Sequence, residues 1–219
     1  MHAVKNVKHF PTQDIGAENE NDGKNMYPGY TVYKNPTVKN ITSDKNGDEP
    51  CYVRMSVDIL NSQGTPITDD QALNLIYKTI YFDKTFTGGY DKKEGKATGL
   101  IQDRIPGYNL AQLAAYPMVN PLWTKDTARS TASKLVFNYM GAKGDGILNI
   151  GEESTLFTNI AIPTDWNQTQ MQKVGNYQLK VTAQAIQSKG FATQSEAYRM
   201  LDEEIKGGTL QEINRGSEN

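Results

Sequence analysis

A chain of 219 residues is long enough for one large all-β domain, or for a smaller domain that carries an insertion. Its 23 basic and 25 acidic residues give a net charge of −2, and no run of lysine or arginine stands clear of acidic neighbours. Phosphate binding needs a concentrated basic face, so nucleic acid is not an expected partner. The longest apolar run is far shorter than the roughly 20 residues that cross a bilayer, so we expect no membrane association of the mature chain.

Residues 1–25 form a polar segment rich in asparagine, lysine, glutamate and glutamine, with a turn signal at Asp22-Gly23. Met1 precedes a polar, basic stretch instead of the apolar core of a signal peptide. We expect this segment to be flexible, or to become ordered only by pairing with something else.

Two strands are expected over residues 30–41 and 51–60, joined by the turn-rich stretch 44–50. The second strand alternates between a buried and a solvent-exposed face. Its apolar positions are Cys51, Val53, Met55, Val57 and Ile59, and its polar face carries Tyr52, Arg54, Ser56 and Asp58.

An insertion is expected around residues 61–130. Thr68-Asp-Asp-Gln71 has the pattern of a capping box, and it predicts an amphipathic helix over 69–81, although Ile76–Phe82 also has the composition of a strand. Residues 85–107 are rich in glycine and charged side chains, which indicates a surface loop. A short helix is expected near 109–116, where Pro117 ends it.

The last third of the chain returns to strands, expected over 135–140, 147–150, 155–166 and 177–187, with a glycine turn at 141–146. In the last of them Leu179 and Val181 are expected to face the core. A second capping box at Thr193 predicts a final helix, before a polar tail over 207–219. Each strand needs a second layer to cover its apolar face. We therefore predict a mainly β protein: one domain over 26–206, a two-sheet, jelly-roll-like antiparallel β-sandwich with a few short peripheral helices.

The order of several blocks resembles the TasA/camelysin family of exported Gram-positive biofilm-matrix fibre proteins. The blocks are Tyr27-Pro-Gly-Tyr30, Lys34-Asn-Pro-Thr-Val-Lys-Asn40, Glu49-Pro-Cys-Tyr-Val-Arg54, Thr155–Trp166, Tyr177–Gln187 and Gly190-Phe191. The resemblance covers roughly residues 26–60 and 135–198. It implies a protein of the cell surface or biofilm matrix that is secreted and extracellular after removal of its signal peptide. It also implies a sandwich whose N-terminal segment pairs with the next subunit.

The sequence contains no convincing catalytic, metal or cofactor motif. Its two histidines, His2 and His9, lie seven residues apart in the N-terminal segment and do not form a zinc-binding pair on a helix. Cys51, the single cysteine, lies on the apolar face of a strand, where a structural thiol is expected. Gly141–Gly146 lacks the ending of a phosphate-binding loop, and residues 44–48 lack the flanking helices and bidentate acid of a calcium loop. We expect no enzyme activity, metal or cofactor.

Three classes of function remain open. In the first, a fibre subunit donates an N-terminal strand to another copy of itself, with Val4, Val7, Phe10 and Ile15 as the apolar points of the donor, and an accessory or anchoring fibre protein is a further possible partner. The second is a pilin with covalent links, made by a sortase at Lys34 or by a self-formed bond between a lysine and an asparagine. The third is a secreted enzyme such as a camelysin-like protease, for which the chain offers only paired carboxylates: Asp69-Asp70, Glu152-Glu153 and Glu203-Glu204.

Overall fold

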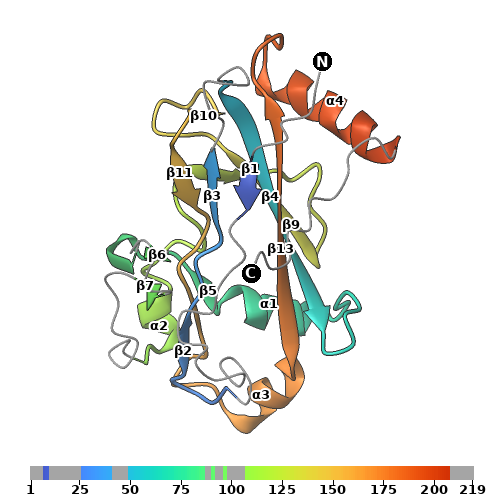
Figure 1. Ribbon diagram of the computed structural model, residues 1–219. Coiled ribbons are helices and arrows are strands. Elements are labelled where there is room, and N and C mark those ends of the chain that lie inside the picture. The colour runs from blue at the N-terminus through green and yellow to red at the C-terminus, as the bar shows by residue number, and fades with distance from the viewer. Residues whose placement is uncertain are drawn as a thin grey trace.

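The computed structural model describes residues 7–9, 26–40, 49–86, 90–91, 96–97 and 107–207. Helices and strands follow in an order dominated by short strands (Figure 1). The strands are β1 (Val7–His9), β2 (Thr31–Tyr33), β3 (Thr37–Asn40), β4 (Cys51–Asn61), β5 (Ile80–Tyr81), β6 (Tyr90–Asp91), β7 (Lys96–Ala97), β8 (Trp123–Lys125), β9 (Lys134–Tyr139), β10 (Ile147–Leu148), β11 (Glu153–Thr155), β12 (Asn159–Ala161) and β13 (Tyr177–Gln187). The helices are α1 (Asp70–Tyr77), the 3-10 turn η2 (Lys84–Phe86), α2 (Leu110–Leu113), α3 (Gln168–Val174) and α4 (Gln194–Lys206).

The first layer is a curled antiparallel sheet built around β4. On one side β4 pairs with β13 along its whole length, from Asn61 opposite Tyr177 to Cys51 opposite Gln187. On its other side it pairs with β9 and β10, and β8 extends the sheet beyond β9. Figure 1 shows β4 and β13 running together along the length of the molecule. Among the described strands, β13 is therefore an end strand of this layer.

The second layer is one long antiparallel ladder formed by β2 and β3 with β12 and β11. Thr31 is opposite Ala161 in one sheet and Val38 is opposite Ser154 in the next, which is the same register. Across the stretch between them, the Lys34 amide donates to the Thr158 carbonyl at 2.8 Å and the Leu156 amide donates to the Pro36 carbonyl at 2.9 Å. β5 extends this layer beside β12, and β1 extends it beside β3.

The two layers enclose the main core, the largest buried cluster among the described residues. Val53, Met55 and Val57 of β4 are at most 1% exposed, and they belong to one buried cluster with residues of the second layer such as Val38 and Leu156. Trp123 closes the same cluster, and its indole nitrogen donates to Ser154 at 2.9 Å. The predicted fold class is confirmed: the protein is mainly β, its layers are antiparallel, and its helices are few and short.

The helix expected over 69–81 is shorter than predicted, because the segment divides between two structures. α1 ends at Tyr77, and Ile80 and Tyr81 form β5, so each sequence alternative holds for part of the segment. The capping residue is Asp69 and not Thr68: its carboxylate accepts from the Gln71 and Ala72 amides. An ionised carboxylate at this position also interacts favourably with the positive end of the helix dipole.

The apolar face of β13 points to the core as predicted, but its side chains are only half buried. Leu179, Val181, Ala183 and Ala185 pack against the main core from its margin. Their cross-strand partners on β4, such as Ile59 opposite Leu179, are almost completely buried. The difference follows from position, since β4 has neighbours on both sides whereas β13 is an end strand.

This difference predicts unequal costs for two equivalent truncations. Ile59→Ala should lower the free energy of unfolding by about 2–5 kcal/mol, because it leaves a cavity in a filled core. Leu179→Ala should cost about 1 kcal/mol, because the side chain already touches water. Urea denaturation of both variants measures the difference. Equal costs would mean that β13 is as deeply buried in solution as β4.

Candidate functional site

The N-terminal strand β1 is the edge strand of the second layer, on the side where β13 of the first layer lies near it. It pairs with β3, with Val7 opposite Asn40 and His9 opposite Val38, and it also approaches β13 of the other layer. We name this region the β3–β13 seam: β3 and β13 are its two borders, and β1 lies in it (Figure 1).

β3, one border of the seam, is hydrogen-bonded to β11 on its other side. The main chain of Asn40 is bonded to the β11 side, where its amide donates to Glu152 and its carbonyl accepts from Gly151. Its side chain is fully buried, and the carboxamide donates to the Leu148 carbonyl at 3.1 Å. Because successive residues of a strand bond to opposite sides, Thr37 and Lys39 direct their main-chain groups toward β1.

β13 offers a second row of main-chain groups along the seam. The Ile59 amide donates to Ser133 on the β9 side, so odd-numbered residues of β4 bond away from β13. By the register of the pair, the odd-numbered residues of β13, including Leu179, Val181 and Ala183, then direct their amides and carbonyls away from β4. Within the described ranges, β13 is paired only with β4. Such an edge is a template for one more strand.

Of the predicted donor residues, only one lies in the part of the chain that the structure describes. Val7 lies in β1 and hence in the seam, whereas Val4, Phe10 and Ile15 fall outside the described residues. The structure thus brings one of the four predicted positions to the seam, paired with the edge of its own sandwich.

Lys34, the predicted covalent-link lysine, lies in the stretch that joins β2 to β3. Its amide is bonded to Thr158, and burial lowers the pKa of its side chain to about 8. A larger fraction of this amine is therefore uncharged near neutral pH than for an ordinary lysine, and the uncharged amine is the nucleophilic form.

A network of ion pairs links the last helix to the first layer. Asp202 of α4 accepts from Arg54 of β4 at 2.6 Å and from Arg129 at 2.8 Å. Arg129 also donates to the Asp126 carboxylate, and this carboxylate accepts a further hydrogen bond from the side-chain amide of Asn138. The arrangement contains no nucleophile or free base, and its chemistry is that of a structural ion-pair network.

The predicted solvent-exposed face of β4 is wrong at this place. Tyr52 and Arg54 are 7% and 5% exposed, because α4 covers them and the Arg54 guanidinium lies over the Tyr198 ring at 5.4 Å. One signal for this contact was available: the helix predicted from Thr193 has apolar positions at Ala197 and Leu201 that need a surface to cover. The sequence did not say which surface.

The paired carboxylates have local structural contacts. Asp69 caps α1 and binds Lys173, Glu153 pairs with Lys39 at 3.4 Å, and Glu203 pairs with Arg199 at 2.9 Å. Burial raises the pKa of the Cys51 thiol to about 12, so it stays protonated and unreactive. Among the described residues, no group of three or more His, Cys, Asp or Glu side chains is placed to hold a metal ion.

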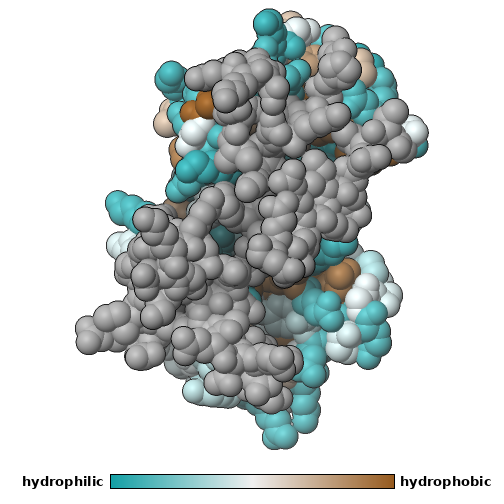
Figure 2. All heavy atoms as spheres, viewed as in Figure 1, coloured by the Kyte–Doolittle hydropathy of each residue, from teal (hydrophilic) through white to brown (hydrophobic). Residues whose placement is uncertain are grey.

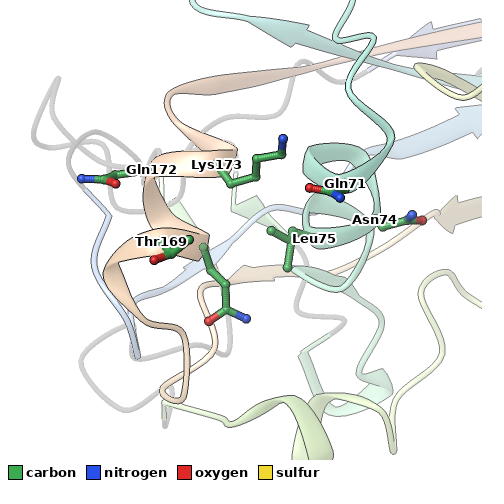
Figure 3. A pocket seen from close by; sticks show the side chains of 7 residues that line it. Gln71, Asn74, Leu75, Thr169, Gln172 and Lys173 are labelled. Atoms are coloured by element: carbon green, nitrogen blue, oxygen red, sulfur yellow. The ribbon is translucent and has the colours of Figure 1, made fainter.

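A shallow hollow of about 610 Å³ lies between α1 and α3 (Figure 3). Amide side chains dominate its lining, including Gln71, Asn74 and Gln172, of which Gln172 points away from α1 in the figure. Lys173, its one charged residue, is paired with Asp69, and the Gln170 side chain accepts from the Asn167 amide as part of a helix cap. Lys173 and Gln170 are therefore engaged in contacts that stabilise the two helices. The lining has no group suited to acid-base or nucleophilic chemistry.

The described surface in Figure 2 is mainly hydrophilic, with apolar residues in small separate groups. In the part of the chain that the structure describes, no helix is long and apolar enough to cross a bilayer. No protein-family model, curated protein or solved structure matches the chain. The fold and the seam therefore define the class, a two-layer β-sandwich with an added N-terminal edge strand, and no relative adds to it.

The ion-pair network predicts how α4 responds to substitution and acid. Burial opposes ionisation of Asp202, but the hydrogen bonds from Arg54 and Arg129 outweigh it and hold the pKa of this carboxyl below its usual range. Asp202→Asn should lower the free energy of unfolding by about 1–3 kcal/mol near pH 7, because two guanidinium groups lose their shared anion. Glu203→Gln, on the exposed side of the same helix, is the control and should change it by less than about 0.5 kcal/mol.

A carboxyl with a lowered pKa stabilises the folded state above its unfolded pKa, near 4, and this contribution disappears as the pH falls through the lower folded value. The gap between wild type and Asp202→Asn should therefore narrow below about pH 4, in urea titrations repeated at several pH values. A gap that stays constant down to pH 2 would contradict the role assigned to Asp202.

Proposed function

We propose that the protein is a secreted, non-catalytic structural subunit that assembles with itself into extracellular fibres of the biofilm matrix or cell surface. Assembly takes place by strand donation: the N-terminal segment of one copy enters the β3–β13 seam of the next. The observation that carries this proposal is the position of β1, an N-terminal strand added to the edge of β3 beside an edge of β13 that no described strand pairs with.

Strand exchange at such a seam should change the free energy little. β1 is bonded to its sandwich by edge pairing over Val7–His9, so the same main-chain hydrogen bonds form whether the strand comes from its own chain or from a neighbour. Every copy uses its donor on one neighbour and its seam on another, and such a head-to-tail contact extends openly when its rotation does not close into a ring. Open repetition then gives a filament.

The half-buried face of β13 supports the same proposal. Leu179, Val181 and Ala183 border the seam with apolar side chains that a longer or better matched donor would cover. The resemblance to the TasA/camelysin family supports the extracellular setting, and it makes an accessory or anchoring fibre protein a further partner.

A covalently linked pilin-type subunit is the second candidate, favoured by one observation. The lowered pKa of Lys34 increases the fraction of this amine that is uncharged, and hence nucleophilic, near neutral pH. A sortase-dependent or self-formed amide at Lys34 would then lock subunits that first meet by strand pairing.

Deleting residues 1–15 tests strand donation. The deletion should leave the sandwich folded, because β1 pairs only at its edge, and it should abolish filaments in negative-stain electron micrographs. Deleting residues 208–219 is the matched control and should leave filaments intact. A synthetic peptide of residues 1–15 should inhibit assembly of the full-length chain by filling the seam.

Two outcomes would refute this mechanism of assembly. Normal filaments of the shortened chain would exclude N-terminal donation. An unfolded shortened chain, by circular dichroism, would show that the segment belongs permanently to its own sandwich.

Substitution of Lys34 tests the covalent candidate separately. Lys34→Arg keeps the positive charge but removes the amine nucleophile, so polymers that withstand boiling in SDS should be lost while filaments still form. Lys39→Arg, in the neighbouring strand, should keep both properties. A wild-type filament that dissolves fully in boiling SDS would eliminate this candidate and leave strand donation standing.

A further inference from the structure

A second hollow, of about 400 Å³, lies between the C-terminal end of α1 and helix α2, and we call it the α1–α2 groove. It differs from the hollow of Figure 3 in its chemistry, because aromatic and aliphatic side chains form most of its lining. These are Tyr77, Ile80, Leu110, Leu113, Tyr116 and Met118. A cavity of a few hundred Å³ with apolar walls and few polar groups is the usual form of a small-molecule site.

The walls of the groove are fixed by contacts outside it. Leu113 and Ile80 are 5% and 3% exposed, so they belong to the interior. The Tyr77 hydroxyl donates to the Ala132 carbonyl, and the Tyr116 hydroxyl lies 3.4 Å from that of Tyr108. Both tyrosines therefore have their polar tips engaged elsewhere.

Helix α2 forms the outer wall and is held at both ends. Asn109 and Gln112 form a reciprocal capping box at its start, and the Leu110 amide donates to Asp165. After the helix, the Pro117 carbonyl accepts from the Phe82 amide, next to β5. The groove is thus largely formed in advance, which lowers the ordering cost of binding a ligand.

The groove carries one positive charge in its lining. Lys78, which caps the C-terminal end of α1, is the one charged residue of the lining. It is exposed, and among the described residues it forms no ion pair with an acidic group. The lining contains no carboxylate that could repel an anion.

We propose that the α1–α2 groove binds an alkyl carboxylate, a fatty-acid-type amphiphile, with its chain against the apolar walls and its carboxylate on Lys78. The apolar lining selects the chain and the single ammonium selects the sign of the head group. The groove is separate from the β3–β13 seam, so this site does not depend on strand donation.

Calorimetric titration of the full-length protein with octanoate, decanoate and dodecanoate, each below its micelle concentration, tests the proposal. Each added methylene should tighten binding by about fourfold while the chain still enters the groove. Decyltrimethylammonium has a similar chain with the opposite charge, and it should bind more weakly than decanoate.

Two substitutions assign the binding to this groove. Ala114→Trp should fill it and abolish decanoate binding, whereas Ala115→Trp, one position along and outside the lining, should bind as wild type does. Lys78→Gln should weaken decanoate binding by about two- to fivefold and leave the trimethylammonium compound unaffected or slightly improved, with Lys180→Gln as the control.

The proposal fails if decanoate and decyltrimethylammonium bind equally, if chain length has no effect, or if Ala114→Trp binds like wild type while remaining folded. If that variant does not fold, Ala111→Trp, at another position of the lining, replaces it under the same criterion. Filament formation by Ala114→Trp should be normal, so failure of this site and failure of strand donation give different results.

Discussion

The pairing of β4 with β13 is the contact on which the rest of the structure depends. It joins two eleven-residue strands that are more than one hundred residues apart in the chain, and every segment between them has to be accommodated around that pair. Closing so long a loop costs entropy before any core contact repays it. The fold therefore needs the almost complete burial of β4, whose Met55 and Ile59 are 0% exposed.

The same pairing explains why the seam exists. Among the described strands, β4 is paired on both sides and β13 on one side only, and β3 is the strand on which β1 is added at the edge of the second layer. Two edges of different layers thus face one another across a width that β1 partly fills. Soluble proteins usually protect such edges with charges, prolines or covering segments. Here the covering segment is the chain's own N-terminal strand, which is held by edge pairing over Val7–His9.

Sequence periodicity was sufficient for elements whose environment is local. The alternation of Val53, Met55 and Val57 predicted the central strand, and the glycines at 141–146 predicted a turn, where Gly141, Gly144 and Gly146 have positive φ angles. Asp69 was missed as the cap because Thr68 fits the same pattern, and only the hydrogen bonds distinguish the two.

Sequence reasoning was less successful where distant elements meet. It assigned Arg54 to water because arginine on the polar face of a strand is usually solvated. Nothing local to Arg54 indicates that Asp202, 148 residues later, will bind it beneath a helix. For the seam, the sequence predicted the N-terminal donor segment but not the strands that border it. Its borders depend on which strands end their layers, and a strand pattern does not encode its neighbours.

The continuous register of the second layer places a restriction on variation along the chain. Residues 34–36 lie between β2 and β3 and contain Pro36, so they resemble a loop in which length changes are harmless. They join β2 and β3 in one ladder, however, with Val32 and Val38 both buried. Inserting or deleting a single residue there would turn one of these valines to the outer face while the other stays in place. This stretch should therefore accept many substitutions but no change in length.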